Sequence, residues 1–262
     1  MIELLDRRRL FLPTHLSGCA LWLRADLGVT LNGSTVSAWA NQGTAGGPCS
    51  QGSGPAQPTW SATGGPNSKP TLTFDGGDSL ASTLAASAWA FLHNSSAIFV
   101  VFKPTTNVSA GSSFFCLLST CGSGATDRGM AMGWDNRGTL TRDDAFAYSA
   151  SNGTAYTTSG VASDLSFPYN ATSIAEVSFD YGAAGNDLAI LANGTSAHSS
   201  ESTGVPSGSA PQSTLVVGRL AGFAFNFIGD ISEVIAFNRA LTAAERSVVR
   251  RYLSNRYGIT VV

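Results

Sequence analysis

The strongest constraint on the fold is a series of short segments rich in β-branched and aromatic residues, each bounded by turn residues. Strands that follow one another without helices between them favour antiparallel sheets packed as a sandwich. The dipeptide Asn193-Gly194 predicts a hairpin between 187–192 and 195–199, because both central residues of a type I′ turn need positive φ. The other predicted strands are 20–25, 35–40, 71–74, 97–103, 114–119, 129–134, 145–149, 173–181, 214–219 and 227–237.

Length and charge limit the class of protein. A chain of 262 residues with 43% apolar side chains is long enough to bury one large core. The net charge of −2 excludes a global attraction to nucleic acid or anionic lipid. The apolar segments are far shorter than the ~18 residues that span a bilayer. We therefore expect a soluble protein with no nucleic-acid partner and no membrane span.

Two segments depart from the strand pattern. Residues 1–15 place three consecutive arginines before a short apolar run that Pro13 interrupts, which is poor for a signal sequence. We expect 1–15 to be an N-terminal arm and 16–262 to be a single domain. Residues 41–70 are dominated by Gly, Pro, Ser and Thr, and their prolines exclude a regular central strand. This segment is expected to be a long surface excursion.

The four cysteines lack the paired spacing of a zinc site. Cys116 and Cys121 could form a local disulfide if the segment between them turns back, and the disulfide state of Cys19 and Cys49 stays open. The redox compartment therefore stays open at this point.

One helix is predicted near the C-terminus. Thr242 and Glu245 form a T-x-x-E capping box, an apolar stripe follows, and Gly258 stands where a C-terminal cap belongs. The other side of this helix is basic, and we expect a solvated face rather than a nucleic-acid surface. Its cations are Arg246, Arg250, Arg251 and Arg256.

Four blocks in a fixed order carry a family resemblance. They are LSGCALWLRA at 16–25, VSAWANQG at 36–43, KPTLTFDGGDSL at 69–80 and the segment 227–245, which runs from a strand into the capped helix. This pattern resembles the concanavalin A-like lectin/glucanase superfamily in its laminin-G-like form. The resemblance implies an all-β, antiparallel jelly-roll β-sandwich of two sheets with one C-terminal α-helix. Many relatives carry an acidic residue at the position of Arg24, so a ligand role for that strand end is not expected.

Glycoside hydrolysis needs two carboxyls that face each other across the scissile bond. The E-x-D-x-E type spacing of the family's glucanases is absent from this sequence. Glu176 and Asp180 would share one face of a strand at a separation of roughly 13 Å, while Asp230 and Glu233 would point to opposite faces. We expect a structural role for Glu233 and no catalytic residues.

A binding site is easier to support from the residues. Sugars are held by an aromatic platform flanked by planar polar groups. Trp134 is the candidate platform and Tyr148 follows it closely in the sequence, although Trp134 as a core residue is the alternative. The resemblance also implies a possible calcium ion, with carboxylate oxygens as its ligands. The candidate ligand-binding residues are Asp127, Arg128, Trp134, Asp135, Asn136 and Tyr148, and the candidate calcium ligands are Asp143 and Asp144.

These observations predict a non-catalytic surface module that recognises glycans or docks onto a protein assembly. Its expected partners are a glycan or neighbouring subunits, including further copies of itself. Its expected location is extracellular or on a virion surface, as a phage decoration, fibre or tail protein. The alternative is a secreted glycoside hydrolase or other polysaccharide-degrading enzyme of the same fold.

Overall fold

The computed structural model describes residues 11–105, 114–122, 127–135, 145–162, 166–181, 187–202, 204–222 and 225–262. Short strands make up most of their regular secondary structure. The helical elements are the 3₁₀ helices η1 (Pro13–His15), η2 (Gly54–Ala56), η3 (Pro66–Ser68) and η4 (Ala86–His93), and the α-helix α1 (Ala243–Tyr257). The strands are β1 (Cys19–Arg24), β2 (Val29–Asn32), β3 (Thr35–Ala40), β4 (Pro48–Ser50), β5 (Thr59–Ser61), β6 (Thr71–Asp75), β7 (Leu80–Ser82), β8 (Ser95–Pro104), β9 (Phe114–Ser119), β10 (Gly129–Asp135), β11 (Ala145–Ser151), β12 (Tyr156–Ala162), β13 (Ser173–Asp180), β14 (Leu188–Ala192), β15 (Thr195–Ser200), β16 (Val216–Val217) and β17 (Ile228–Phe237).

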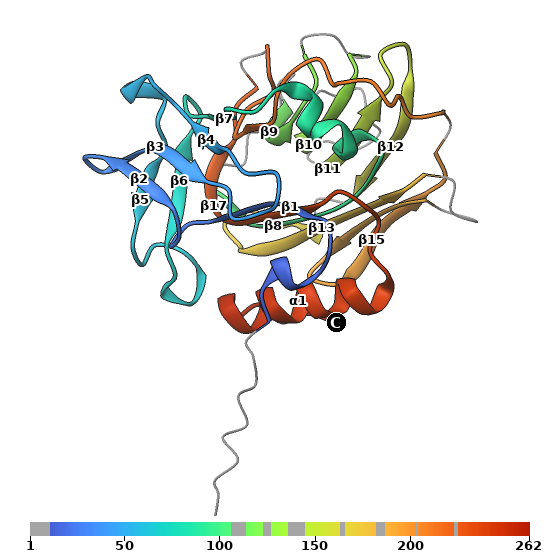
Figure 1. Cartoon of the computed structure of the whole chain (residues 1–262). Helices are drawn as coiled ribbons and strands as arrows, with labels where there is room; N and C mark the ends of the chain where they lie inside the picture. The colour runs from blue at the N-terminus through green and yellow to red at the C-terminus, as the bar shows by residue number, and fades with distance from the viewer. Residues whose placement is uncertain are drawn as a thin grey trace, which may run out of the picture.

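The described strands form two packed layers. Wherever two of these strands pair, they run antiparallel. One layer has the order β1-β17-β8-β13-β14-β15. The other has the order β7-β16-β9-β10-β11-β12. Figure 1 shows the two layers one above the other, with β2 to β6 at one side and α1 beneath the lower layer. This arrangement confirms the predicted all-β sandwich with a C-terminal α-helix.

The main core lies between the two layers and is rich in aromatic rings. Phe102, Trp134, Phe146 and Phe167 form one cluster, in which the centroids of Phe146 and Phe167 are 4.5 Å apart. Trp39, from before the Pro-rich segment, is buried in the same core as Phe74, from after it. Such large rings bury more apolar area than any other side chains, so they dominate the stabilisation of the sandwich.

A second apolar cluster lies on the outer face of the first layer, under α1. Phe99 and Phe237 of the sheet meet at 6.4 Å between ring centroids, and Leu253 and Tyr257 of α1 cover them. The helix begins as predicted: Thr242 Oγ1 accepts from the Glu245 N–H, and the Glu245 carboxylate accepts from the Thr242 N–H at 2.9 Å. It ends at Gly258, whose φ of 67° confirms the predicted left-handed cap.

The structure confirms the predicted hairpin turn and adds two strands to the Pro-rich segment. Asn193 and Gly194 have φ values of 51° and 88° and join β14 to β15, so the predicted hairpin is confirmed. Residues 41–70 are more regular than expected, because they contain the short strands β4 and β5. Pro48 begins β4 and Pro58 immediately precedes β5, positions at which a missing N–H costs the ladder little.

A β-bulge in β17 changes the face on which Glu233 lies relative to Asp230. The register of β17 against β8 shifts between Ile231 and Glu233. Ile231 lies in the main core, but Glu233, two residues later, points to the opposite face and meets α1. A regular strand would place residues two apart on the same face, so the extra residue reverses the alternation. Asp230, next to the core residue Ile231, lies on the face that Glu233 also occupies, so the prediction that the two point to opposite faces is wrong because it assumed a strand without a bulge.

The cysteines carry no disulfide. Cys19, Cys49 and Cys116 are buried and Cys121 is half-buried, and none of the four is joined by a disulfide. The local Cys116–Cys121 bridge considered from the sequence is therefore not formed.

Among the described residues, no helix is both long and apolar enough to cross a bilayer.

Candidate functional site

The predicted aromatic platform is not at the surface. Trp134 is 2% exposed and its ring packs against Phe102 and Phe146, with centroids 5.0 and 5.2 Å away. Tyr148 is fully buried, and its hydroxyl donates to the Leu92 carbonyl at 2.8 Å. Rings enclosed on all sides cannot stack on a sugar, so the prediction that Trp134 and Tyr148 contact a ligand is wrong. The alternative, in which Trp134 belongs to the core, agrees with the structure.

The other predicted site residues are scattered or lie outside the described residues. Asp127 and Arg128 are half-buried just before β10, and Arg128 Nε donates to the Ala210 carbonyl at 2.5 Å. Asp135 is the last residue of β10. Asn136, Asp143 and Asp144 lie outside the described residues, so the calcium prediction stays a prediction. Within the described ranges, no group of three or more His, Cys, Asp or Glu side chains is placed to hold a metal ion.

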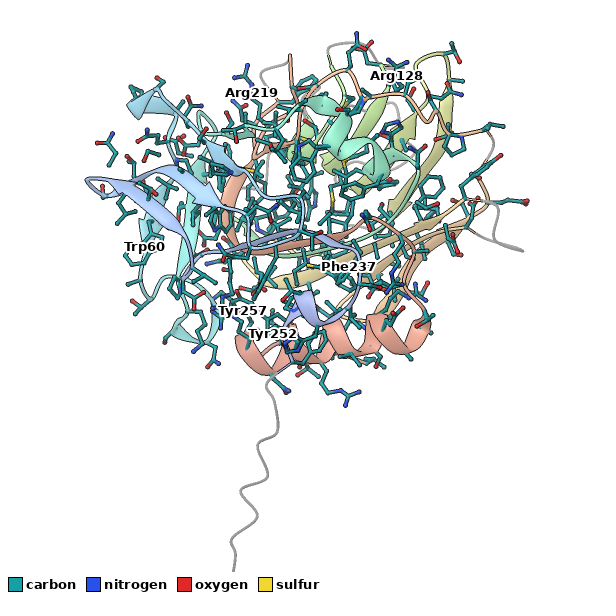
Figure 2. The ribbon with its side chains drawn as sticks, in the orientation of Figure 1. Trp60, Arg128, Arg219, Phe237, Tyr252 and Tyr257 are labelled. Carbon is teal, nitrogen blue, oxygen red and sulfur yellow. The ribbon has the colours of Figure 1, made fainter. Side chains whose placement is uncertain are left out.

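A different site appears against α1. A pocket of about 450 Å³, which we call the helix pocket, opens between this helix, the start of the described chain, the end of β1 and the segment around η3. Figure 2 shows Tyr252 and Tyr257 at α1, below the lower sheet. The helix pocket is lined by Phe11, Leu12, Arg24, Asn67, Lys69, Val248, Arg251, Tyr252, Asn255 and Arg256.

The helix supplies one continuous wall of the pocket. Its lining residues follow the spacing i, i+3, i+4, i+7 and i+8, which places them on a single face. Opposite the end of this wall, the Asn67 side chain donates to the Arg256 carbonyl at 3.0 Å and so ties η3 to the last turn of α1. The residues of the helix wall are Val248, Arg251, Tyr252, Asn255 and Arg256.

The N-terminal segment supplies an aromatic wall. The Phe11 ring meets the Tyr252 ring edge to face, with 6.0 Å between their centroids, and it meets His15 at the same distance. Phe11, Leu12 and Leu16 also pack against the apolar cluster under α1. Residues 11–16 therefore contact the helix of their own chain and narrow the pocket from one side.

Two of the four cations in the pocket are already paired. Arg24 Nε and Arg256 Nη2 contact the two oxygens of Asp26 at 2.6 and 2.5 Å. Burial alone would raise the pKa of Asp26, but the hydrogen bonds and charges of Arg256 and Arg24 lower it. Asp26 therefore remains ionised and holds both guanidinium groups at one side of the pocket.

The other two cations, Lys69 and Arg251, have no ion-pair partner among the described residues. Lys69 follows η3 and is half-buried, while Arg251 is exposed on α1. Their charges are therefore not cancelled by a carboxylate of the described chain. The pocket combines this surplus positive charge with the amides of Asn67 and Asn255 and the rings of Phe11 and Tyr252.

A buried carboxylate supports the floor of the pocket. Glu233 is fully buried and accepts hydrogen bonds from Trp22 Nε1 at 2.7 Å, the Tyr257 hydroxyl at 2.7 Å and the Tyr252 hydroxyl at 2.8 Å. Arg256 Nε lies 3.5 Å from the same carboxylate. Burial raises the pKa of Glu233, and these hydrogen bonds only partly oppose it. This geometry fixes Tyr252 and agrees with the structural role expected for Glu233.

The basic face of α1 is less solvated than predicted. Glu176 is fully buried on β13, with Arg250 Nη1 at 2.8 Å from Oε2 and Arg246 Nε at 3.6 Å from Oε1. Burial raises the pKa of Glu176, while Arg250 and Arg246 lower it. Three of the four predicted solvated arginines therefore pair with carboxylates of the sheet layer, because Asp26, Glu176 and Glu233 lie under the helix. Only Arg251 keeps the expected exposure.

Sequence reasoning missed the helix pocket because its walls come from four segments far apart in the chain. The one available signal was the helical stripe from Val248 to Arg256, which mixes cations with a tyrosine and an asparagine. The arginines of that stripe predict a solvated face and say nothing of a pocket. Lys69 lay within a block used for the family resemblance and carried no separate signal.

Known proteins were compared by sequence and by fold. No family model matches the sequence, and no curated protein matches it. The fold is similar to that of the binding domain of botulinum neurotoxin DC, solved in complex with SialylT, with a TM-score of 0.54, 10% identity, and coverage of 90% of this chain and 52% of that one. It is also similar to Trypanosoma rangeli sialidase, solved in complex with sialic acid, with a TM-score of 0.53, 14% identity, and coverage of 92% and 33%.

These likenesses concern the fold. The chain spans about half of the toxin domain and a third of the sialidase. At such low identity the shared feature is the β-sandwich itself, because one fold supports many unrelated functions.

Proposed function

We propose that this protein is a non-catalytic module of the concanavalin A-like type that binds carbohydrate in the helix pocket. The observation that carries this proposal is the composition of the pocket: two aromatic rings, two amides and two cations without an ion-pair partner among the described residues line about 450 Å³. Small-ligand pockets have this size and this mixture of apolar walls with a few polar groups. Both fold neighbours named above are described with ligands bound, which makes carbohydrate a reasonable first class of ligand to test.

The chemistry of the walls suits a sugar. A pyranose has apolar C–H faces that pack on aromatic rings and hydroxyls that pair with planar polar groups. Phe11 and Tyr252 offer such rings, and Asn67 and Asn255 offer amides that both donate and accept. The Tyr252 ring is held in place by its hydrogen bond to Glu233, so this wall is ordered before a ligand arrives.

The positions of the buried glutamates support a non-catalytic role. A glycosidase needs two carboxyls with access to the substrate. Glu176 and Glu233 are both fully buried and engaged by residues of α1. Neither can reach a glycosidic bond without unfolding its surroundings.

A glycan array that carries neutral and acidic oligosaccharides tests the proposal. Asn255→Trp places a bulky ring at the exposed helix wall of the pocket, while Ala244→Trp makes the same addition at an exposed helix position outside it. We expect wild type and A244W to bind the same glycans and N255W to lose them. Binding that survives in N255W would place any glycan site elsewhere. The absence of binding by every variant would refute the proposed function.

Docking onto neighbouring subunits is the second candidate function, including a place on a phage virion or another extracellular surface. The observation in its favour is strand β2, which among the described residues pairs only with β3 and exposes Leu31 by 45%. Exposed apolar side chains on an edge strand favour association. Light scattering of wild type and Leu31→Lys tests this candidate: a dimer or larger species that the variant abolishes supports it, and a monomer in both opposes it.

A further inference from the structure

The charge of the helix pocket specifies its ligand further. Four cations line it, and within the described ranges the carboxylates that reach them come from Asp26 and Glu233. Arg24 contacts Asp26 and also lies over the Trp22 ring, with its Cζ 5.2 Å from the centroid. Arg256 contacts both carboxylates and lies over the Tyr257 ring at 5.4 Å. These two guanidinium groups therefore already contact carboxylates and aromatic rings of the folded chain.

Lys69 and Arg251 differ from these two arginines in their contacts. Neither forms an ion pair or a cation–π contact within the described part of the chain, and both line the pocket. They come from different elements, since Lys69 follows η3 and Arg251 lies on α1, and η3 is tied to α1 through Asn67. Two cations that line one cavity without a carboxylate partner from the described residues could each pair with an anionic ligand.

The remaining walls show what kind of anion fits. A small inorganic anion would leave most of a 450 Å³ pocket unfilled, and it would not use the rings of Phe11 and Tyr252. An acidic sugar uses both features, because its ring packs on the aromatic wall while its carboxylate meets the cations. The carboxylate also suits Arg251, whose planar guanidinium can donate two parallel hydrogen bonds to it.

We propose that the helix pocket is selective for sugars that bear a carboxylate, and that Lys69 and Arg251 bind this carboxylate. This inference rests on the proposed function, because it assigns the ligand class of the same pocket. It does not involve Arg24 or Arg256 as ligand contacts. Since both Lys69 and Arg251 have access to solvent, the attraction is expected to weaken as salt is added.

Calorimetric titration with defined probes tests the inference. The acidic probes are sialyllactose and digalacturonic acid, the neutral probe is lactose, and inorganic phosphate is the competing simple anion. The variants are Lys69→Gln and Arg251→Gln. The matched control is Lys103→Gln, which removes the same charge from β8, away from the pocket.

We expect wild type to bind at least one acidic probe more tightly than lactose, and each pocket variant to lose three- to tenfold in affinity for it. K103Q should bind like wild type, and phosphate should not displace the acidic sugar at equal concentration. Equal affinity for acidic and neutral probes, with both abolished by N255W, would overturn the inference and leave the proposed function intact. An equal loss in K103Q, or displacement by phosphate, would show that only net charge or a bare anion matters. Binding of none of the sugars would refute the proposed function as well.

Discussion

The indole nitrogen of Trp22 donates a hydrogen bond of 2.7 Å to a carboxylate oxygen of Glu233, although 211 residues separate the two in the sequence. They lie on the neighbouring strands β1 and β17, on the face that α1 covers. Tyr252 and Tyr257 of the helix donate to the same carboxylate. The buried carboxylate of Glu233 therefore joins β1, β17 and α1 and holds a wall of the helix pocket in place.

The Trp22 hydrogen bond should be worth more than an ordinary one, because its acceptor is a buried carboxylate. We expect Trp22→Phe to lower the free energy of unfolding by about 2–4 kcal/mol, which combines the lost hydrogen bond with lost packing. Trp60→Phe is the matched control, since Trp60 Nε1 donates to the neutral Ala25 carbonyl at 2.8 Å. Urea unfolding should show a smaller loss for W60F. Equal losses of unfolding free energy in W22F and W60F would mean that the carboxylate acceptor Glu233 gives no stronger hydrogen bond than a neutral carbonyl.

The raised pKa of Glu233 should appear as a pH dependence of stability. Because the folded state holds this proton more tightly than the unfolded chain, its contribution is complete below the ordinary pKa of 4.5 and is lost as pH rises through the folded value. Relative to Glu233→Gln, wild type should therefore lose stability as pH increases above about 4.5. Urea unfolding between pH 4 and 8 measures the difference. A wild type that gains stability over this range relative to E233Q would contradict the account.

The capping glutamate should act in the opposite direction. The hydrogen bond from Arg239, with further ones from Thr242, lowers the pKa of Glu245 from 4.5 to about 2. Its contribution is therefore present above pH 4.5 and is lost as pH falls towards 2. Wild type and Glu245→Gln should converge in unfolding free energy across this window. A constant gap down to pH 2 would show that the carboxylate charge does not stabilise the cap.

Two adjacent arginines of α1 should differ sharply in their effect on stability. Arg250→Ala leaves the carboxylate of Glu176 buried, with only Arg246 nearby, and should cost roughly 2–3 kcal/mol. Arg251→Ala removes an exposed side chain and should change stability by less than about 0.5 kcal/mol. Thermal or urea unfolding of the pair checks this contrast. Similar effects would mean that the helix face is uniformly solvated.

The sequence predicted those features that depend on neighbouring residues. Asn193-Gly194 sets its own turn, and Thr242 with Glu245 sets its own helix start, so both were predictable. The orientation of Trp134 was also available, because Met130 and Met132 alternate with it and share its face in the core. The polar residues beside Trp134 favour a ligand site, but this alternation places the ring in the core.

Other features depend on contacts between distant segments and have no local signal. The bulge before Glu233 changes which face its side chain occupies, and it follows from the pairing of β17 with β8. The arginines of α1 looked solvated because Asp26 and Glu176 are far from them in sequence. The helix pocket likewise exists only after η3, β1, α1 and the N-terminal segment have come together.

The most direct test of the central claim is to map the ligand on the folded protein. Backbone amide chemical shifts, recorded while sialyllactose or digalacturonic acid is added, report which residues a bound sugar perturbs. The account predicts perturbations that centre on Lys69, Arg251, Tyr252 and Asn255 and that vanish in N255W. Perturbations confined to the opposite layer, β9 to β12, with the helix pocket unchanged, would contradict it.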